Sequence, residues 1–377
     1  MTQSSAAFAD SKKHFLILDA LRGVAALVVV LFHVLEVYSG GDHLKQLINH
    51  GYLAVDFFFM LSGYVMAHAY DDRWSSMTIK DFFKRRLIRL HPMIIMGMTI
   101  GAICFYFGAS AVFPLIAKTS IWQMLLVLLI GYTLIPLPTS MDIRGWSEMH
   151  PLNGPAWSLF FEYIANLLHA LILRRLSKTV LSILVIIAAA ALVQYAVTSP
   201  GGDIIGGWSV EPEQLRIGFT RLLFPYMAGM LLRRMVKVAG KKNTFLLCGM
   251  LLVAVLSFPR VGGATHLWAN GLYDSLCVIL VFPVIIYAGA IGEVTNATAE
   301  KICTFLGDIS YPVYIIHYPF VYMMYAWVTE NKVPFATGVL TGIGMLVAVT
   351  ALAYALLKWY DEPLRKWLAK KCMTAGR

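Results

Sequence analysis

The first apolar segment of the chain carries ionisable side chains whose types suit acid–base chemistry. Residues 18–36 read LDALRGVAALVVVLFHVLE and contain Arg22, His33 and Glu36. An ionisable group at the centre of a bilayer costs at least about 3 kcal/mol on insertion scales, so such groups mark functional sites by default. Arg22 and His33 are eleven residues apart, which puts them on one helical face, about 16 Å apart along the axis. Asp19 and Glu36 extend this face by three residues at either end.

His33 is a candidate general base. Histidine is the side chain that most readily exchanges a proton near neutral pH, and a positioned histidine can take the proton of a hydroxyl nucleophile. Glu36 could orient its ring and stabilise the charged form, as a carboxylate does in hydrolase triads. His33 could instead bridge two helices by hydrogen bonds. Arg22 is always charged, so it needs either an anionic or carbonyl-bearing ligand or a structural partner such as Asp19.

The elements that position these side chains follow from composition. The 377 residues are 59% hydrophobic and only 14% charged, whereas soluble domains carry about 25% charged residues. We therefore expect a polytopic membrane protein, with one domain over residues 1–377. The net charge of +10 resides in short basic stretches, which indicates topology and anionic ligands and argues against nucleic acid. The apolar segments, each of about 17 residues or more, are 15–37, 51–70, 90–108, 121–137, 157–174, 180–197, 215–233, 244–259, 271–291, 304–327 and 334–358.

Basic stretches indicate which ends of these segments face the cytoplasm. They are residues 80–91, 174–178, 233–242 and the tail after Lys358. Three apolar segments separate the first two stretches, but two cytoplasmic loops require an even number of crossings. We therefore expect segment 121–137 not to cross, because Pro136 and Pro138 break a helix.

The predicted fold is an all-α polytopic membrane protein. It has about ten transmembrane helices plus one re-entrant or interfacial segment around a polar cavity, since irregular backbone at membrane depth must be buried or line a wet cavity. Both termini, residues 1–14 and 361–377, are expected to be cytoplasmic tails. The cysteines lack CxxC spacing, so we expect free thiols and no metal site at Cys104, Cys248, Cys277, Cys303 and Cys372.

The basic stretch 80–91, which we interpret as a loop, could bind phosphate groups. Arg86 and Arg89 are three residues apart and could present two guanidinium forks on one face; Lys84 and Arg85 add charge beside them. The same residues could serve only topology or lipid headgroups.

Two later segments add candidates that could line a site. In NGPAWSLFFEY these are Asn153, Trp157, Ser158 and Glu162. The acid needs a partner within the membrane, for which Arg22 or His33 is a candidate. In SYPVYIIHYP they are Tyr311, Tyr314 and His317. The tyrosines could stack on a sugar ring or anchor at the interface, and His317 has a structural or acceptor-side role in our interpretation.

Six ordered pieces of the chain resemble the membrane-bound acyltransferase-3 family. They read LDALRGVAALVVVLFH, VDFFFMLSGYVMA, FFKRRLIRLHP, NGPAWSLFFEY, LGDISYPVYIIHYP and DEPLRKW. The resemblance places the family's Arg-X10-His pattern on Arg22 and His33 and its RxxR pattern on Arg86 and Arg89. It also implies a site-lining role for the WSLxxE residues of the fourth piece. Because the chain stops soon after its last apolar segment, it resembles the stand-alone form, without an SGNH-type esterase domain.

This resemblance implies an O-acyltransferase of the bacterial cytoplasmic (inner) membrane. The donor would be cytoplasmic acyl-CoA, with acetyl-CoA expected, and the acceptor a hydroxyl of a carbohydrate or glycolipid; no metal is implied. Two alternatives stay open: a sugar or lipid transporter or flippase, and a non-catalytic acyl-CoA sensor. Transporters often show two repeated halves, and the first segment has no repeat in the second half, which favours the enzyme. The acceptor and the oligomeric state are left open by the sequence.

Overall fold

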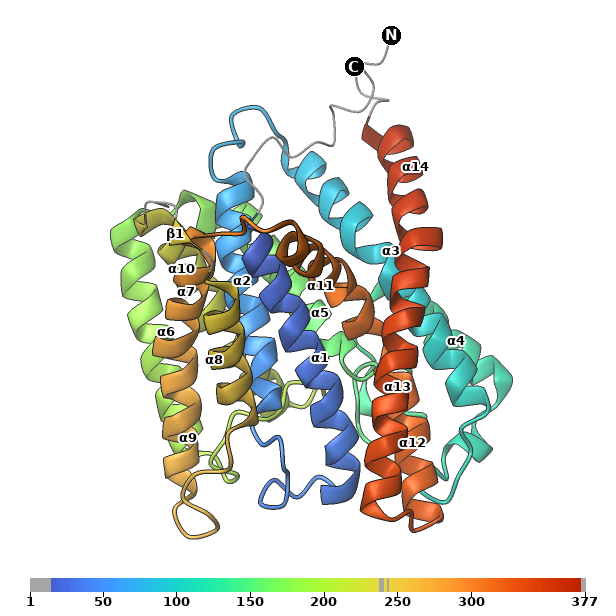
Figure 1. Cartoon of the computed structure of the whole chain (residues 1–377). Helices are drawn as coiled ribbons and strands as arrows, with labels where there is room; N and C mark the ends of the chain where they lie inside the picture. The colour runs from blue at the N-terminus through green and yellow to red at the C-terminus, as the bar shows by residue number, and fades with distance from the viewer. Residues whose placement is uncertain (1–14, 237–240, 243, 374–377) are drawn as a thin grey trace.

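The computed structural model describes residues 15–236, 241–242 and 244–373, and this part of the chain forms fourteen α-helices (Figure 1). Their bounds are α1 (Leu16–Ser39), α2 (Ala54–Tyr70), α3 (Ile79–Tyr106), α4 (Ile121–Thr133), α5 (Ala156–Leu171), α6 (Lys178–Thr198), α7 (Pro212–Met235), α8 (Phe245–Ser257), α9 (Leu267–Leu276), α10 (Phe282–Ile291), α11 (Ala297–Ile316), α12 (Tyr318–Glu330), α13 (Phe335–Leu356) and α14 (Glu362–Met373). Two π-helical turns, Cys277–Val281 and Leu357–Asp361, join α9 to α10 and α13 to α14.

Smaller elements connect these helices. The strands β1 (Lys241–Lys242) and β2 (Gly292–Glu293) pair in parallel. The 3₁₀ turns are Gly51–Leu53, Ile116–Lys118, Thr139–Met141 and Leu173–Arg175.

The all-α class and the multi-pass membrane character are confirmed. Six helical stretches are long and apolar enough to cross a membrane within the described residues. They are Leu16–Ser39, Gly51–Tyr70, Ile79–Tyr106, Lys178–Thr198, Leu267–Ile291 and Phe335–Met373. The larger count of ten crossings stays a prediction.

Helix α1, which carries the first set of candidate residues, packs closely against α11 in the middle of the bundle (Figure 1). Close approach is possible because residue 23 is glycine: a Cβ there would lie 2.2 Å from the carbonyl oxygen of Leu306. The helix ends at Ser39 and is capped by Gly40, whose φ of +59° lies in the left-handed region that glycine tolerates. The two helices therefore bring the SYPVYIIHYP segment against the face that carries Arg22 and His33.

Segment 121–137 behaves differently from its neighbours. Helix α4 has only 13 residues, and it ends at Thr133 before reaching Pro136. The stretches on either side of α4 contact each other, since the rings of Phe113 and Trp146 lie 5.0 Å apart between their centroids. The connections before and after α4 thus meet each other, which favours the prediction that this segment does not cross.

The interpretation of residues 80–91 as a loop was wrong. They form the first turns of α3, which continues through Pro92 as far as Tyr106. The helix begins with a capping box: the backbone N–H of Asp81 donates to the Thr78 hydroxyl, and that of Thr78 donates to the Asp81 carboxylate. Lysine, arginine and leucine then favour the helix, so the basic side chains project from a rigid element.

The segment after Lys358 is also helical, as far as Met373 in α14. Helix α14 ends, and α1 and α3 begin, toward the same end of the bundle (Figure 1), as termini on one side of a membrane require. Which side faces the cytoplasm stays a prediction. The expected tail over residues 1–14, the last four residues of the tail 361–377 and part of the basic stretch 233–242 lie outside the described residues.

Candidate functional site

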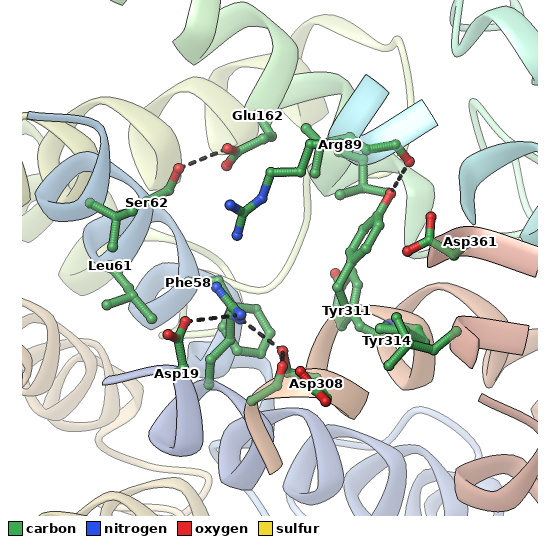
Figure 2. A pocket seen from close by; sticks show the side chains of 18 of the residues that line it. Asp19, Phe58, Leu61, Ser62, Arg89, Glu162, Asp308, Tyr311, Tyr314 and Asp361 are labelled. Carbon is green, nitrogen blue, oxygen red and sulfur yellow. Dashed lines mark hydrogen bonds and ion pairs between the residues drawn. The ribbon is translucent and has the colours of Figure 1, made fainter. Parts of the chain in front are cut away.

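A cavity of about 600 Å³ lies among α1, α2, α3, α5, α11 and the start of α14. Figure 2 shows polar side chains from several of these helices converging on it. Apolar residues of α2, such as Phe58 and Val65, form one wall. Its charged and hydroxyl-bearing lining residues include Asp19, Arg22, Ser62, Arg86, Arg89, Ser158, Glu162, Asp308, Ser310, Tyr311, Tyr314, Asp361, Glu362 and Arg365.

Arg22 lines this cavity and also has the structural partner that its sequence position suggested. Its Nη2 lies 3.1 Å from Oδ1 of Asp19, and its Nε donates to the Ser310 hydroxyl at 2.8 Å. The side chain keeps 26% of its surface accessible. The guanidinium is thus held in a fixed orientation by α1 and α11 while part of it faces the cavity.

The two arginines of the RxxR pattern have different surroundings. Arg86 is buried, and its Nη2 lies 2.8 Å from Oε1 of Glu162, which also accepts a hydrogen bond from Ser62 at 2.7 Å. The partner of Glu162 is therefore Arg86, and not Arg22 or His33 as the sequence suggested. Arg89 reaches into the middle of the cavity (Figure 2) and forms no ion pair with a described residue.

This difference corrects the expectation of two free guanidinium forks. Residues three apart on a helix differ by about 60° in direction, so Arg86 turns toward α5 while Arg89 turns into the open space. Lys84 and Arg85 do not line the cavity; the Lys84 ammonium instead donates to the carbonyl oxygen of Cys372 in α14, at 3.2 Å. Of the predicted basic group, Arg89 alone presents an unpaired charge to the cavity in the described structure.

Ser158 and Tyr314 lie at the floor of the cavity, and their hydroxyl oxygens are 2.7 Å apart. Tyr311 lines the wall, and its hydroxyl donates to the carbonyl oxygen of Leu90 at 2.7 Å. Both tyrosines thus share a cavity with Arg22 and Arg89. This position does not favour the idea that they stack on a sugar acceptor.

Asn153 and Trp157 do not line the cavity. The Asn153 amide donates to the carbonyl oxygen of Ile315 at 2.7 Å. The Trp157 ring lies 5.2 Å from the buried guanidinium of Arg221. These two residues position α5 against its neighbours.

His33 forms the expected contact with Glu36: Nδ1 lies 2.7 Å from the carboxylate oxygen Oε2. A carboxylate can only accept, so Nδ1 carries the proton and Nε2 keeps its lone pair. Both side chains are partly accessible, at 18% and 31%, yet neither lines the cavity. His33 is linked to the cavity floor through His317. The two imidazole rings stack, with 5.5 Å between their centroids.

His317 completes this link. It is fully buried, and its Nδ1 lies 2.8 Å from the backbone carbonyl oxygen of Tyr314, while its Nε2 has no hydrogen-bond partner. The rings of Tyr314 and His317 lie 6.0 Å apart. The order Tyr314, His317, His33, Glu36 therefore runs from the cavity floor toward the other end of α1.

Sequence reasoning missed a polar cluster next to His33. The centroid of the Tyr318 ring lies 4.7 Å from that of His33 and 4.6 Å from that of Tyr322. The Tyr322 hydroxyl donates a hydrogen bond to the Glu148 carboxylate at 2.5 Å. Burial raises the pKa of the Glu148 carboxyl to about 7, against the opposing effects of Arg144 and Tyr322. The charges in DIRGWSEMH looked like those of an ordinary connecting loop, so no sequence signal distinguished this residue.

The structure adds cavity residues that were not singled out in the sequence: Ser62, Asp308, Ser310, Asp361, Glu362 and Arg365. All of them lie within the quoted pieces VDFFFMLSGYVMA, LGDISYPVYIIHYP and DEPLRKW. These pieces therefore meet around one cavity. Among the described residues, the five cysteines are unpaired and no group of three or more His, Cys, Asp or Glu could hold a metal ion.

A family model and two named relatives point to acyl transfer. A family model described as an acyltransferase domain matches residues 15–358. "Protein 2 in picA locus" of Rhizobium radiobacter is 34% identical over 165 residues, which are 42% of this chain and 82% of that protein. The O-acetyltransferase OatA of Staphylococcus aureus is 22% identical over 369 residues, or 93% of this chain and 57% of OatA.

The acyltransferase MdmB of Streptomyces mycarofaciens is 30% identical over 152 residues, which are 39% of this chain and 36% of MdmB. This chain thus spans little more than half the length of OatA. No solved structure matches it.

Proposed function

Because this chain belongs to the acyltransferase-3 family and is an acyltransferase, we propose that it moves an acyl group from acyl-CoA to a hydroxyl of a carbohydrate or glycolipid acceptor. The printed name of OatA, an O-acetyltransferase, supports an acetyl donor and an oxygen acceptor. The enzyme would work in the bacterial cytoplasmic membrane, with the start of α1 and the end of α14 toward the cytoplasm.

One observation carries the proposal: the unpaired Arg89 guanidinium projects into a cavity whose far end adjoins the histidine pair. Acyl-CoA bears a diphosphate and a 3′-phosphate, and a guanidinium fork binds phosphate oxygens through charge-assisted hydrogen bonds. The cavity follows α11 from Cys303 to Tyr314, a rise of about 16 Å over eleven residues. This length suits the extended arm between the diphosphate and the thioester of CoA.

His33 then acts as the base at the opposite side of the floor. Its Nε2 takes the proton of the acceptor hydroxyl while the hydroxyl oxygen bonds to the acyl carbon. Glu36 holds Nδ1–H at 2.7 Å and stabilises the imidazolium that forms. The carbon–sulfur bond breaks, and the thiolate of CoA takes up the proton. The acceptor approaches from the accessible side of His33, so CoA stays on the cytoplasmic side throughout.

Purified protein incubated with acetyl-CoA labelled in the acetyl group tests this function. We expect label on an added sugar or lipid-linked glycan and release of free CoA thiol in equal amounts. Movement of unmodified sugar or lipid across proteoliposomes, with no label transferred, would instead identify a transporter, and donor binding without either would identify a sensor. Comparing envelope glycan acetylation in a deletion strain and its parent would identify the acceptor.

A further inference from the structure

A pair of buried hydroxyls marks the point where the cavity meets the histidines. Tyr314 and Ser158 are only 6% and 5% exposed, and their oxygens lie 2.7 Å apart. The Phe58 ring packs edge-on against Tyr314 at 5.4 Å. Both residues line the cavity, and Figure 2 shows Tyr314 beside Tyr311. The phenol is therefore rigidly placed, with a short contact to the Ser158 hydroxyl and a long one, of 3.5 Å, to the Pro155 carbonyl oxygen.

Counting protons shows what this pair can offer a ligand. The Ser158 hydroxyl has two acceptors within reach, the Pro155 carbonyl oxygen at 2.9 Å and the Tyr314 oxygen at 2.7 Å. When Ser158 donates to Tyr314, the phenol proton has only a long hydrogen bond of 3.5 Å to the Pro155 carbonyl oxygen, so it can turn to a closer acceptor on a ligand. The hydroxyl of Tyr311 lacks this freedom, since it donates to Leu90 at 2.7 Å.

The position of Tyr314 relative to His33 shows how its hydroxyl can act as a donor in the reaction. Its carbonyl oxygen holds Nδ1 of His317, and the His317 ring stacks on His33. A thioester at the cavity floor therefore lies beside the phenol, with His317 and then His33 beyond it. Arg22 lies about one helical turn farther from His317 than Tyr314 does, because its contact Ser310 precedes Tyr314 by four residues.

We propose that the Tyr314 hydroxyl is a catalytic residue, the donor that stabilises the oxyanion of the acyl-transfer reaction, and that Ser158 is its positioning residue. The proposal rests on the function proposed above. As the acceptor oxygen bonds to the carbonyl carbon, the carbonyl π electrons move to the oxygen, which accepts a hydrogen bond from Tyr314. When the electrons return, the carbon–sulfur bond breaks and CoA leaves as a thiolate, which takes up the proton that His33 accepted.

A neutral phenol suits this task because Tyr314 and Ser158 are buried. A donor aimed at the oxygen where charge develops stabilises the transition state more than the bound substrate. Removing one such donor typically lowers kcat by about 10²–10³-fold. Tyr314→Phe removes the hydroxyl and keeps the ring that packs on Phe58 and His317, so it isolates this effect.

The test is steady-state kinetics on purified full-length variants, with CoA affinity and thermal melting measured in parallel. We expect Tyr314→Phe to lower kcat by about 10²–10³-fold while CoA affinity and the melting temperature stay near those of the wild type. Ser158→Ala should lower kcat by about tenfold, the effect of one ordinary hydrogen bond. The double variant should be no slower than Tyr314→Phe, because Ser158 acts through the phenol. Tyr132→Phe is the matched control, since that hydroxyl contacts Thr99 at the α3–α4 contact, and it should leave kcat unchanged.

A Tyr314→Phe enzyme with near-normal kcat would overturn the proposal, as would a loss confined to KM for the donor. If that variant does not fold, Ser158→Ala decides: normal kcat overturns the proposal, and reduced kcat with unchanged donor affinity supports it. A double variant much slower than Tyr314→Phe would overturn the role of Ser158. Failure of the wild type to use acyl-CoA would instead reject the proposed function, whereas an active wild type with a weakened Arg89→Ala donor site and a normal Tyr314→Phe rejects this inference alone.

Discussion

Replacing Arg89 and Arg86 separately by alanine should have opposite consequences, although the two residues are three positions apart. Arg89 reaches into the cavity without an ion pair to a described residue, so its loss leaves no protein group unpaired. A hydrogen bond to a charged group is worth about 1.5–3 kcal/mol net. Arg89→Ala should therefore weaken CoA binding by about 10–150-fold, since about 1.4 kcal/mol corresponds to a factor of ten, while the melting temperature stays close to that of the wild type.

Arg86→Ala should act on stability instead. It leaves the Glu162 carboxylate, whose side chain is 13% exposed, without the guanidinium 2.8 Å away. Removing one partner of a buried ion pair costs about 3–5 kcal/mol. The double variant Arg86→Met with Glu162→Gln removes the stranded charge, so it should recover much of the melting temperature lost in Arg86→Ala.

Calorimetric titration of CoA and of 3′-dephospho-CoA into detergent-solubilised protein, together with thermal melting, measures both effects. If the 3′-phosphate is the group that Arg89 binds, the variant will no longer distinguish the two ligands. Unchanged CoA affinity in Arg89→Ala would refute the assignment of the cavity to the donor. An Arg86→Ala protein as stable as the wild type would refute the reasoning about the Glu162 pair.

Three further outcomes follow from the geometry. Glu36→Gln should slow transfer less than His33→Ala does, because the amide still accepts a hydrogen bond from Nδ1–H but gives the imidazolium no charge partner. Release of CoA thiol measures the turnover of both variants, and a Glu36→Gln turnover as low as that of His33→Ala would contradict this. Burial raises the pKa of Glu148 to about 7 from an ordinary 4.5. Its contribution to the free energy of unfolding is therefore full below about pH 4.5 and is lost as pH rises through about 7, by up to about 3 kcal/mol. Melting curves of Glu148→Gln should lack this fall in stability, and a parallel pH dependence in both proteins would contradict it. Single cysteines placed in residues 110–120 and 139–150 should react with an impermeant reagent from the same side of the membrane; labelling from opposite sides would show that segment 121–137 crosses.

Local spacing was enough to predict the contact of His33 with Glu36 and the class of the fold. The contact of His33 with Glu36 follows from a separation of three residues on a helix, and the membrane character follows from composition. The capping box at Thr78 was also readable from the sequence, but the density of charge before Pro92 led us to interpret a helix as a loop. Sequence reasoning could thus predict features that depend only on residues within one segment.

Sequence reasoning could not predict the contacts between distant segments. The pairing of Arg86 with Glu162 joins residues 76 positions apart, and a carboxylate in a membrane segment could have met any of several cations. The orientation of Tyr314 toward the cavity depends on how closely α11 packs on α1 at Gly23. Glu148 reaches Tyr322 from a connection with no regular pattern. Such pairs are set by tertiary packing, which no periodicity in one segment encodes.

The most direct test of the central claim is the rate of acyl transfer by His33→Ala, measured with labelled acetyl-CoA on protein whose CoA affinity and melting temperature are determined in the same preparation. A positioned base contributes about 10²–10⁴-fold in rate, so the account predicts a loss of at least this order with CoA binding intact. His33→Gln should not restore transfer, because an amide can form hydrogen bonds but cannot take up the proton. Near-normal turnover in His33→Ala would contradict the account and would remove His33 as the base.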